Sequence, residues 1–239
     1  MRGARPDSQG RAPHSLKEGD TVGSSGPHDR IIHALCKEIL LPMGVFQKGR
    51  SRLYLDDNGW YVTMIEFQPS GFSKGTYLNV GLHFLFKRED CWSFDYSDGN
   101  PRIGDLIVFE SEEQFARDVR PYVEKARDCA LKYRAFRDVV HAKEVILRRK
   151  AVPGCAPWIL YHQGMICLLA RHGMRGRHLY RQFLRNCSPR FKPSVLEAGY
   201  PRSALGMNHD SVMTLIQQNR ASLHSLPSMG KMPSFSEFE

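Results

Sequence analysis

The sequence predicts an α+β fold, in which an antiparallel sheet of about four strands is backed by helices and followed by a C-terminal helical hairpin. Three observations predict it. Residues 51–86 place apolar side chains at every second position between turn-forming residues, which is the period of a strand. Residues 122–140 space their apolar side chains by three and four, which is the period of a helix, and residues 157–172 are apolar nearly all round, as in a buried helix. A chain of 239 residues with 41% hydrophobic residues can also bury a sizeable core.

The elements before the sheet are a tail and one helix. Residues 1–27 are rich in Gly, Pro, Ser and Arg and lack apolar periodicity, so we expect a disordered tail. From His28 onward the apolar side chains have helical spacing, and Pro42 and Gly44 are expected to end that helix. The spaced residues are Ile31, Ile32, Leu35, Ile39 and Leu40.

The sheet is predicted from a hairpin and a long third strand. Strands at 51–55 and 60–67 flank Asp56-Asp57-Asn58-Gly59, whose residues accept the backbone angles of a tight turn. Residues 76–86 then alternate strictly, so one face of that strand is expected to enter the core. Its core residues would be Leu78, Val80, Leu82, Phe84 and Phe86, and short outer strands are expected at 92–96 and 107–109.

A long helical region follows the sheet. Ser111 and Gln114 have the spacing of a capping box, which marks a helix start. Pro121 is expected either in the first turn of a second helix or within one long helix that it kinks. A single apolar stripe is predicted to cover the sheet, and it consists of Tyr122, Ala126, Cys129, Tyr133, Phe136 and Val140.

The C-terminal part is predicted to be a basic helical hairpin and a tail. Residues 157–172 are apolar nearly all round, which indicates a buried helix. Gly173 to Gly176 is expected to connect it to a second helix at 177–186. The hairpin, residues 151–192, would pack on an α+β domain of residues 28–150. Residues 193–239 would be a loosely ordered tail with one helix at 211–226.

Composition limits the classes of protein and partner. No apolar run follows the N-terminal arginines, so a secretory signal is not expected, and the six scattered cysteines are predicted to be reduced thiols of a cytoplasmic protein. No apolar run approaches the ~20 residues of a membrane helix, so no membrane contact is expected. The net charge is +9, and residues 151–206 contain eight Lys and Arg against one acidic residue. This excess favours an acidic partner or a nucleic acid.

The sheet region resembles a known family. The resemblance rests on Phe46-Gln47-Lys48-Gly49, Tyr54, Asp57, Trp60-Tyr61, Phe67-Gln68-Pro69-Ser70 and Leu78-Asn79-Val80-Gly81. These residues resemble the bacterial domain-of-unknown-function 4304 family, over about residues 28–150. The resemblance implies an antiparallel α+β sheet backed by helices, and it implies no activity. Pro69 stands where the family usually has a basic residue, so no role of that position is carried over.

The hairpin has two weaker resemblances of its own. Leu169 to Met174, followed by Arg177 to Phe183, is similar to the helix-turn-helix of AraC-type regulators, which would direct Arg175, Arg177, His178 and Arg181 toward DNA. The same stretch is also similar to a tetratricopeptide-like helix pair, which would cap the core or dock a protein. That second similarity is carried by Trp158, Tyr161, Gly164, Leu168, Tyr180 and Phe183.

Two surfaces are candidate binding sites. The polar face of the sheet combines aromatic and amide side chains that can hold a peptide or a base, and it consists of Gln68, Tyr77, Asn79 and His83. A ridge of arginines on the hairpin could bind an anion or an acidic partner, and it consists of Arg171, Arg175, Arg177, Arg181 and Arg185. The alternative for each is an ordinary solvated strand face or helix face.

No cofactor, metal site or catalytic residue is predicted. His162 and His172 share one helix stripe, but their separation along the helix is about 15 Å, which is too far for one zinc ion. A hydrolase would need Cys155 beside His162, or Cys187 beside His178, as nucleophile and base. Nothing in the sequence marks either cysteine as activated.

The sequence therefore favours a non-catalytic binding protein that contacts an acidic protein partner. An immunity-type or accessory role is expected by analogy. The alternatives are a nucleic-acid-binding protein that uses residues 171–185 and an uncharacterised hydrolase. Charge reversal at Arg177, Arg181 and Arg185 would separate the first two, because phosphate binding depends on those charges and a contact through the sheet does not.

Overall fold

The computed structural model describes residues 26–87, 92–150, 156–187 and 203–224, and they form an α+β fold. One five-stranded sheet has the order β1-β2-β3-β4-β5, and every strand is antiparallel to its neighbour. The predicted sheet is confirmed, with β1 as an additional edge strand. The strands are β1 (Phe46–Gln47), β2 (Leu53–Asp57), β3 (Tyr61–Pro69), β4 (Gly75–Phe84) and β5 (Arg102–Val108).

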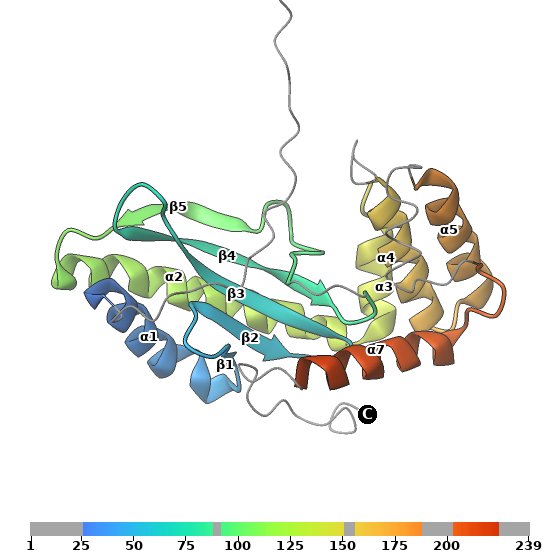
Figure 1. The fold of residues 1–239 in the computed structure, drawn as a ribbon, viewed down its shortest axis with the longest axis horizontal. Coiled ribbons are helices and arrows are strands. Elements are labelled where there is room, and N and C mark those ends of the chain that lie inside the picture. Colours follow the sequence, from blue (N-terminus) through green and yellow to red (C-terminus); the bar gives the residue numbers. More distant parts are fainter. Residues whose placement is uncertain (1–25, 88–91, 151–155, 188–202, 225–239) are drawn as a thin grey trace, which may run out of the picture.

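Helices lie on one face of the sheet and at one end of it. Figure 1 shows α2 running along the sheet with α1 beside it, while α3, α4 and α5 group beyond the end of β4. The helices are α1 (Pro27–Ile39), α2 (Glu112–Tyr133), α3 (Val139–Leu147), α4 (Ala156–Leu169), α5 (Gly173–Asn186) and α7 (His209–His224), with 3-10 turns η1 (Leu41–Met43) and η2 (Arg134–Arg137). Within the described ranges, no helix has the length and apolar character that crossing a membrane requires.

The β2–β3 turn begins two residues later than predicted. Asp56 and Asp57 are paired strand residues, opposite Thr63 and Val62. Gly59 has a φ of 83°, a left-handed conformation that glycine adopts without the steric cost of a Cβ. Successive strand residues point to opposite faces, so the two carboxylates leave the sheet in opposite directions. The later start of the turn therefore determines which helices the Asp56 and Asp57 carboxylates contact.

The alternation of β4 is as predicted, and α2 covers its apolar face. Leu78, Val80, Leu82 and Phe84 are all buried. The start of β3 is attached to the end of α2, because Trp60 Nε1 donates to the Phe136 carbonyl at 3.2 Å. The facing residues of α2 are also buried, namely Phe115, Val119, Val123, Ala126, Ala130 and Tyr133.

The predicted stripe of α2 is correct only in part. Ala126, Tyr133 and Phe136 are buried, but Val140 is 57% exposed. The reason is that α2 ends at Tyr133 and the tighter η2 turn changes the helical phase before α3 begins. The start of α2 follows the prediction, because Ser111 Oγ accepts from the Gln114 backbone N–H at 3.1 Å. Pro121 lies on an exposed side of one long helix.

The outer strands differ from the prediction in extent. The strand expected at 107–109 is the end of a longer one, β5. Of the stretch 92–96, only Tyr96 pairs, as an isolated bridge to Leu82. Residues of this stretch instead form polar contacts with β4.

The connection between α4 and α5 is shorter than predicted. Gly173 to Gly176 forms the first turn of α5, and the chain reverses just before it, at Arg171, whose φ is 62°. Gly176 has to be helical because α5 packs very close to α4. A Cβ at Gly176 would lie 2.6 Å from Leu168 Cγ and 2.9 Å from the Gly164 carbonyl oxygen. The two glycines therefore set the contact distance of the hairpin.

The helix expected at 211–226 is α7, and it is packed. Val212 and Ile216 are fully buried. Asn219 Nδ2 donates to the Leu85 carbonyl at 2.6 Å, which joins α7 to the chain just after β4. This part of the chain is thus attached to the sheet, where a loosely ordered tail was expected. The tail predicted at 1–27, and residues 193–202 and 225–239, fall almost wholly outside the described residues.

Candidate partner-binding site

Three of the four predicted sheet-face residues come together. Gln68 on β3 and Tyr77 and Asn79 on β4 surround Arg102 of β5. Arg102 Nη2 donates to Gln68 Oε1 at 2.6 Å, and its guanidinium carbon lies 4.0 Å from the centroid of the Tyr77 ring. Asn79 Nδ2 donates to Gln68 Oε1 at 3.0 Å and to Glu66 Oε2 at 2.8 Å. The cross-strand register places all five side chains on one face.

This patch satisfies most of its own polar groups. Burial raises the pKa of Glu66, while the hydrogen bond from Asn79 and the charge of Arg102 oppose that rise. Arg102 and Glu66 were absent from the predicted site. Residues 102–106 were not predicted to be a strand, and no feature of the sequence singled out Glu66. The patch can add a flat aromatic and guanidinium surface to an interface, but it has few unsatisfied donors.

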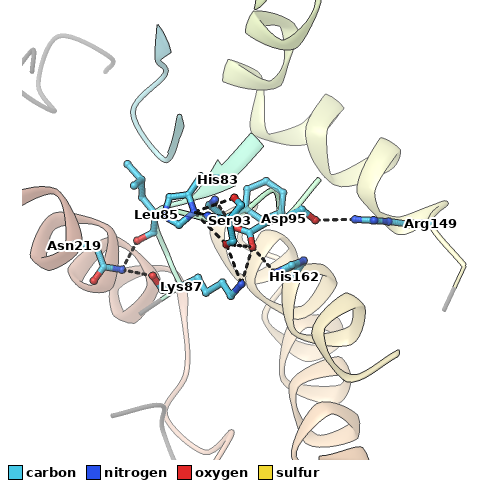
Figure 2. Close-up of polar contacts among 9 residues, drawn as sticks. His83, Leu85, Lys87, Ser93, Asp95, Arg149, His162 and Asn219 are labelled. Atoms are coloured by element: carbon cyan, nitrogen blue, oxygen red, sulfur yellow. Dashed lines mark hydrogen bonds and ion pairs between the residues drawn. The ribbon is translucent and has the colours of Figure 1, made fainter. Parts of the chain in front are cut away.

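His83 does not belong to that patch. It lies further along β4, is 5% exposed, and its Nδ1 is 3.4 Å from Asp95 Oδ2. Figure 2 shows His83 within a buried polar network centred on the Asp95 carboxylate. Lys87 Nζ lies 2.7 Å from Asp95 Oδ1, Ser93 Oγ donates to the same oxygen at 2.9 Å, and the Phe84 backbone N–H donates to Oδ2 at 2.8 Å.

The electrostatics of this network keep Asp95 charged and His162 neutral. Burial raises the pKa of Asp95, but the charge and the hydrogen bond of the neighbouring Lys87, with the imidazole of His83 nearby, outweigh that effect and hold it below its usual value. Burial lowers the pKa of His162 to about 3. His162 Nε2 is 3.9 Å from Asp95 Oδ1, and within the described structure it is buried without a hydrogen-bond partner.

The network connects parts of the chain that are distant in sequence. Arg149 Nη1, after α3, donates to the Asp95 carbonyl at 2.8 Å, and Asn219 on α7 donates to the Lys87 carbonyl at 2.9 Å (Figure 2). His162 approaches from α4. Because the Asp95 carboxylate is enclosed and already engaged, we assign this network a structural role. In the described parts of the chain, no group of three or more His, Cys, Asp or Glu side chains could hold a metal ion.

The predicted arginine ridge lies on α5 and just before it. Arg171, Arg175, Arg181 and Arg185 are exposed. Arg177 is half-buried and its Nη1 donates to the Met207 carbonyl at 3.3 Å, so this residue attaches the hairpin to the chain before α7. The exposed ridge therefore consists of Arg171, Arg175, Arg181 and Arg185, without Arg177.

The ridge has no ion-paired counter-charge in the described residues, although Glu144 of α3 lies near enough to Arg175 for that arginine to help lower the pKa of Glu144. Residues 156–187 contain no Asp or Glu, and none of the four exposed arginines forms an ion pair within the described ranges. The exposed arginines of α2 differ, because each lies beside a carboxylate: Arg117 with Asp118, Arg120 with Glu38 and Arg127 with Asp128. Met174, in the first turn of α5, adds an apolar side chain that is 84% exposed.

The residues suggested for a hydrolase are not arranged as a nucleophile and a base. Cys187 is buried, whereas His178 is exposed on the other side of α5 and pairs with Gln182 at 3.1 Å. His162 faces Asp95, and Cys155 lies outside the described residues. His172 Nε2 lies 3.1 Å from Lys143 Nζ. The sequence could not predict the positions of these cysteines and histidines, because they depend on tertiary packing.

Comparisons of the chain with protein-family models, with curated proteins and with solved structures find no match. The resemblance of residues 28–150 to the domain-of-unknown-function 4304 family therefore stays a prediction. The function has to be argued from the geometry of the site.

Proposed function

We propose that this chain is a non-catalytic binding protein that docks an acidic surface of another protein on the outer face of α5. One observation carries the proposal: four exposed arginines on α5 and just before it form no ion pair with a described residue, whereas Arg117, Arg120 and Arg127 of α2 are each paired with a carboxylate. Unpaired like charges raise the electrostatic energy of the folded protein, and an acidic partner relieves this repulsion.

The outer face of α5 is built to present these charges. Met174, His178, Arg181 and Arg185 follow helical spacing on the side opposite the buried Tyr180. The close contact of Gly176 with α4 holds the helix itself, so a partner would have to order only side chains. The positive charges stand on a rigid helix around the exposed side chain of Met174. This arrangement favours a partner that has a small apolar surface for Met174 and carboxylates around that surface.

The sheet patch contributes less to this proposal. Gln68 and Asn79 already bond to their neighbours, so the patch can offer the exposed Arg102 and the half-buried ring of Tyr77. It would act as a second contact region for the same partner. An immunity-type or accessory role remains part of the proposal and rests on analogy with proteins of similar build.

The proposal is tested by charge reversal on α5. The chain with Arg175, Arg181 and Arg185 changed to Glu is compared with wild type for proteins retained from a nuclease-treated extract, and the retained protein is then purified. We expect an acidic protein whose affinity falls by more than about tenfold in this triple variant and weakens as salt is raised.

The matched control reverses three exposed arginines on α2, namely Arg117, Arg120 and Arg127. This variant carries the same change in net charge, and it should retain the partner. Equal loss of binding in both variants would show a general charge effect and remove α5 as the site. Salt-dependent binding to duplex DNA that only the α5 variant loses would favour the nucleic-acid alternative.

A further inference from the structure

An open hollow of about 560 Å³ lies beside the end of α3, and none of its lining residues belongs to α5. Its size is within the range of small-molecule sites. One wall is the turn after Tyr96, and the other is the last part of α3 with the residues that follow it. The lining includes Tyr96, Asp98, Val145, Arg148, Arg149 and Lys150.

Three consecutive basic residues dominate this wall. Arg149 is held in place, because its Nη1 donates to the Asp95 carbonyl at 2.8 Å (Figure 2) and its guanidinium lies 5.6 Å from the centroid of the Tyr96 ring. The side chains of Arg148 and Lys150 are exposed, and neither side chain forms a hydrogen bond or an ion pair with any described residue. Arg148 does help to lower the pKa of Glu144, one turn earlier on α3. The hollow thus has one fixed cation and two cations that can turn toward a ligand.

The carboxylate in the lining does not cancel these charges. Asp98 Oδ2 lies 2.6 Å from Lys132 Nζ, and its Oδ1 accepts a hydrogen bond from the Tyr96 hydroxyl at 2.9 Å. Because Lys132 already neutralises Asp98, the balance of the hollow stays positive. An anion entering it would meet Arg148, Arg149 and Lys150 without displacing an existing ion pair.

We infer that this hollow binds a small organic phosphate, with the phosphoryl oxygens on Arg148, Arg149 and Lys150. One guanidinium group can donate two parallel hydrogen bonds to two phosphoryl oxygens. The ammonium group of a lysine adds a positive charge on a flexible side chain. The hollow is far larger than one inorganic oxyanion, and Val145 adds an apolar wall for the organic part. The site is separate from α5, so it does not depend on the proposed docking function.

The test is calorimetric titration of the full chain at low salt with ADP, pyrophosphate, orthophosphate and adenosine. We expect saturable one-site binding of ADP, weaker binding of the two inorganic ions and none of adenosine. The double variant Arg148→Ala, Lys150→Ala should bind ADP more than about tenfold more weakly, because two charge-assisted contacts are lost. The matched control, Arg117→Ala with Arg127→Ala, removes two arginines of α2 that lie in neither proposed site, and it should bind ADP normally.

Three results would overturn this inference. They are the absence of saturable ADP binding, equal weakening in the two double variants, and binding of orthophosphate as tight as that of ADP. The first two would exclude a phosphate site in the hollow, and the third would exclude an organic ligand. Equal melting temperatures of both variants and wild type would confirm that the chain stays folded. Failure of the α5 partner experiment would leave these results unchanged.

Discussion

Arginines occupy two contrasting environments in this protein. At the β2–β3 turn, three consecutive residues each bind an arginine from a distant segment: Asp56 binds Arg134 at 2.7 Å, Asp57 binds Arg220 at 2.7 Å and Asn58 binds Arg137 at 2.8 Å. On α5, the exposed arginines have no such partners in the described structure. The same type of side chain thus joins helices to the sheet in one region and remains available at the surface in the other.

Burial distinguishes the arginines that stabilise the fold from those whose charge is available for binding. Arg220 is 3% exposed, and both of its terminal nitrogens bond to the Asp57 carboxylate, at 2.7 and 2.8 Å. A buried guanidinium without that partner would lose its hydration and gain nothing in return. An exposed arginine keeps its hydration, so the fold does not require it to be paired. Its charge therefore remains available to a binding partner.

Breaking the buried pair should have the largest effect. We expect Asp57→Ala to lower the free energy of unfolding by about 3–5 kcal/mol, because it leaves the Arg220 charge buried and unpaired. Urea denaturation at neutral pH measures the change. Asp128→Ala, which removes the carboxylate of the exposed Arg127 pair, is the control and should cost no more than about 1 kcal/mol. Similar losses in the two variants would show that burial does not separate the two classes.

His162 is an intermediate case, since it is buried and its Nε2 lacks a partner in the described structure. Its folded pKa of about 3 lies below the unfolded value of about 6.5, so the unfolded chain binds the proton first as pH falls. Wild type should therefore lose up to about 1.4 kcal/mol of stability per pH unit from this group below pH 6.5, with the loss ending near pH 3.

Replacing His162 with Phe should remove that part of the acid sensitivity. Urea denaturation at pH 7 and pH 5 would show a smaller loss on acidification in His162→Phe than in wild type. Asp95 does not interfere in this window: its folded pKa is lowered, so its stabilisation is complete above an unfolded pKa of about 3.9 and is lost only as pH falls through the lower folded value. Equal slopes in the two proteins would contradict a buried neutral His162.

The position of α5 depends on the two glycines at its contact with α4. Gly176→Ala should lower the free energy of unfolding by about 1–3 kcal/mol, because the added methyl group would overlap Leu168 and the Gly164 carbonyl. Gly71→Ala is the control, since a Cβ at Gly71 would have no atom within 4 Å. If both variants were as stable as wild type, the close approach of the two helices would be disproved.

The smallest effect on stability is expected on the ridge itself. Arg181→Ala should change the free energy of unfolding by no more than about 0.5 kcal/mol, because the side chain is exposed and has no partner within the described residues. The same urea experiment would measure it. A loss as large as that of Asp57→Ala would show that Arg181 supports the fold and would remove the contrast on which the proposed function rests.

The elements of the fold could largely be predicted, because their signals are local. The alternation of residues 76–84, the Ser111 capping box and the helical spacing of residues 157–169 each involve side chains a few positions apart. The errors arose where two elements meet. Val140 is exposed because η2 changes the helical phase, and α5 already begins at Gly173, where a loop was expected, with Gly176 at its close contact with α4.

The candidate site was predictable to a smaller extent. The arginines of α5 were evident from their spacing, but burial against Met207 removes Arg177 from the exposed set. His83 was grouped with Asn79 because both lie on one face of β4, and the Asp95 network separates them. Arg102 was missed because its neighbour in the sheet depends on strand pairing.

By itself, the sequence determined the α+β class, the strand and helix periods and the basic character of the hairpin, because these follow from side chains close together in the chain. Only the tertiary structure decided which charges are paired. Asp57 and Arg220 are far apart in sequence, and they meet because the register of β2 against β3 directs the Asp57 carboxylate toward α7. Coulomb energy and desolvation depend on distances in space, so chain packing determines whether an arginine is structural or available for binding.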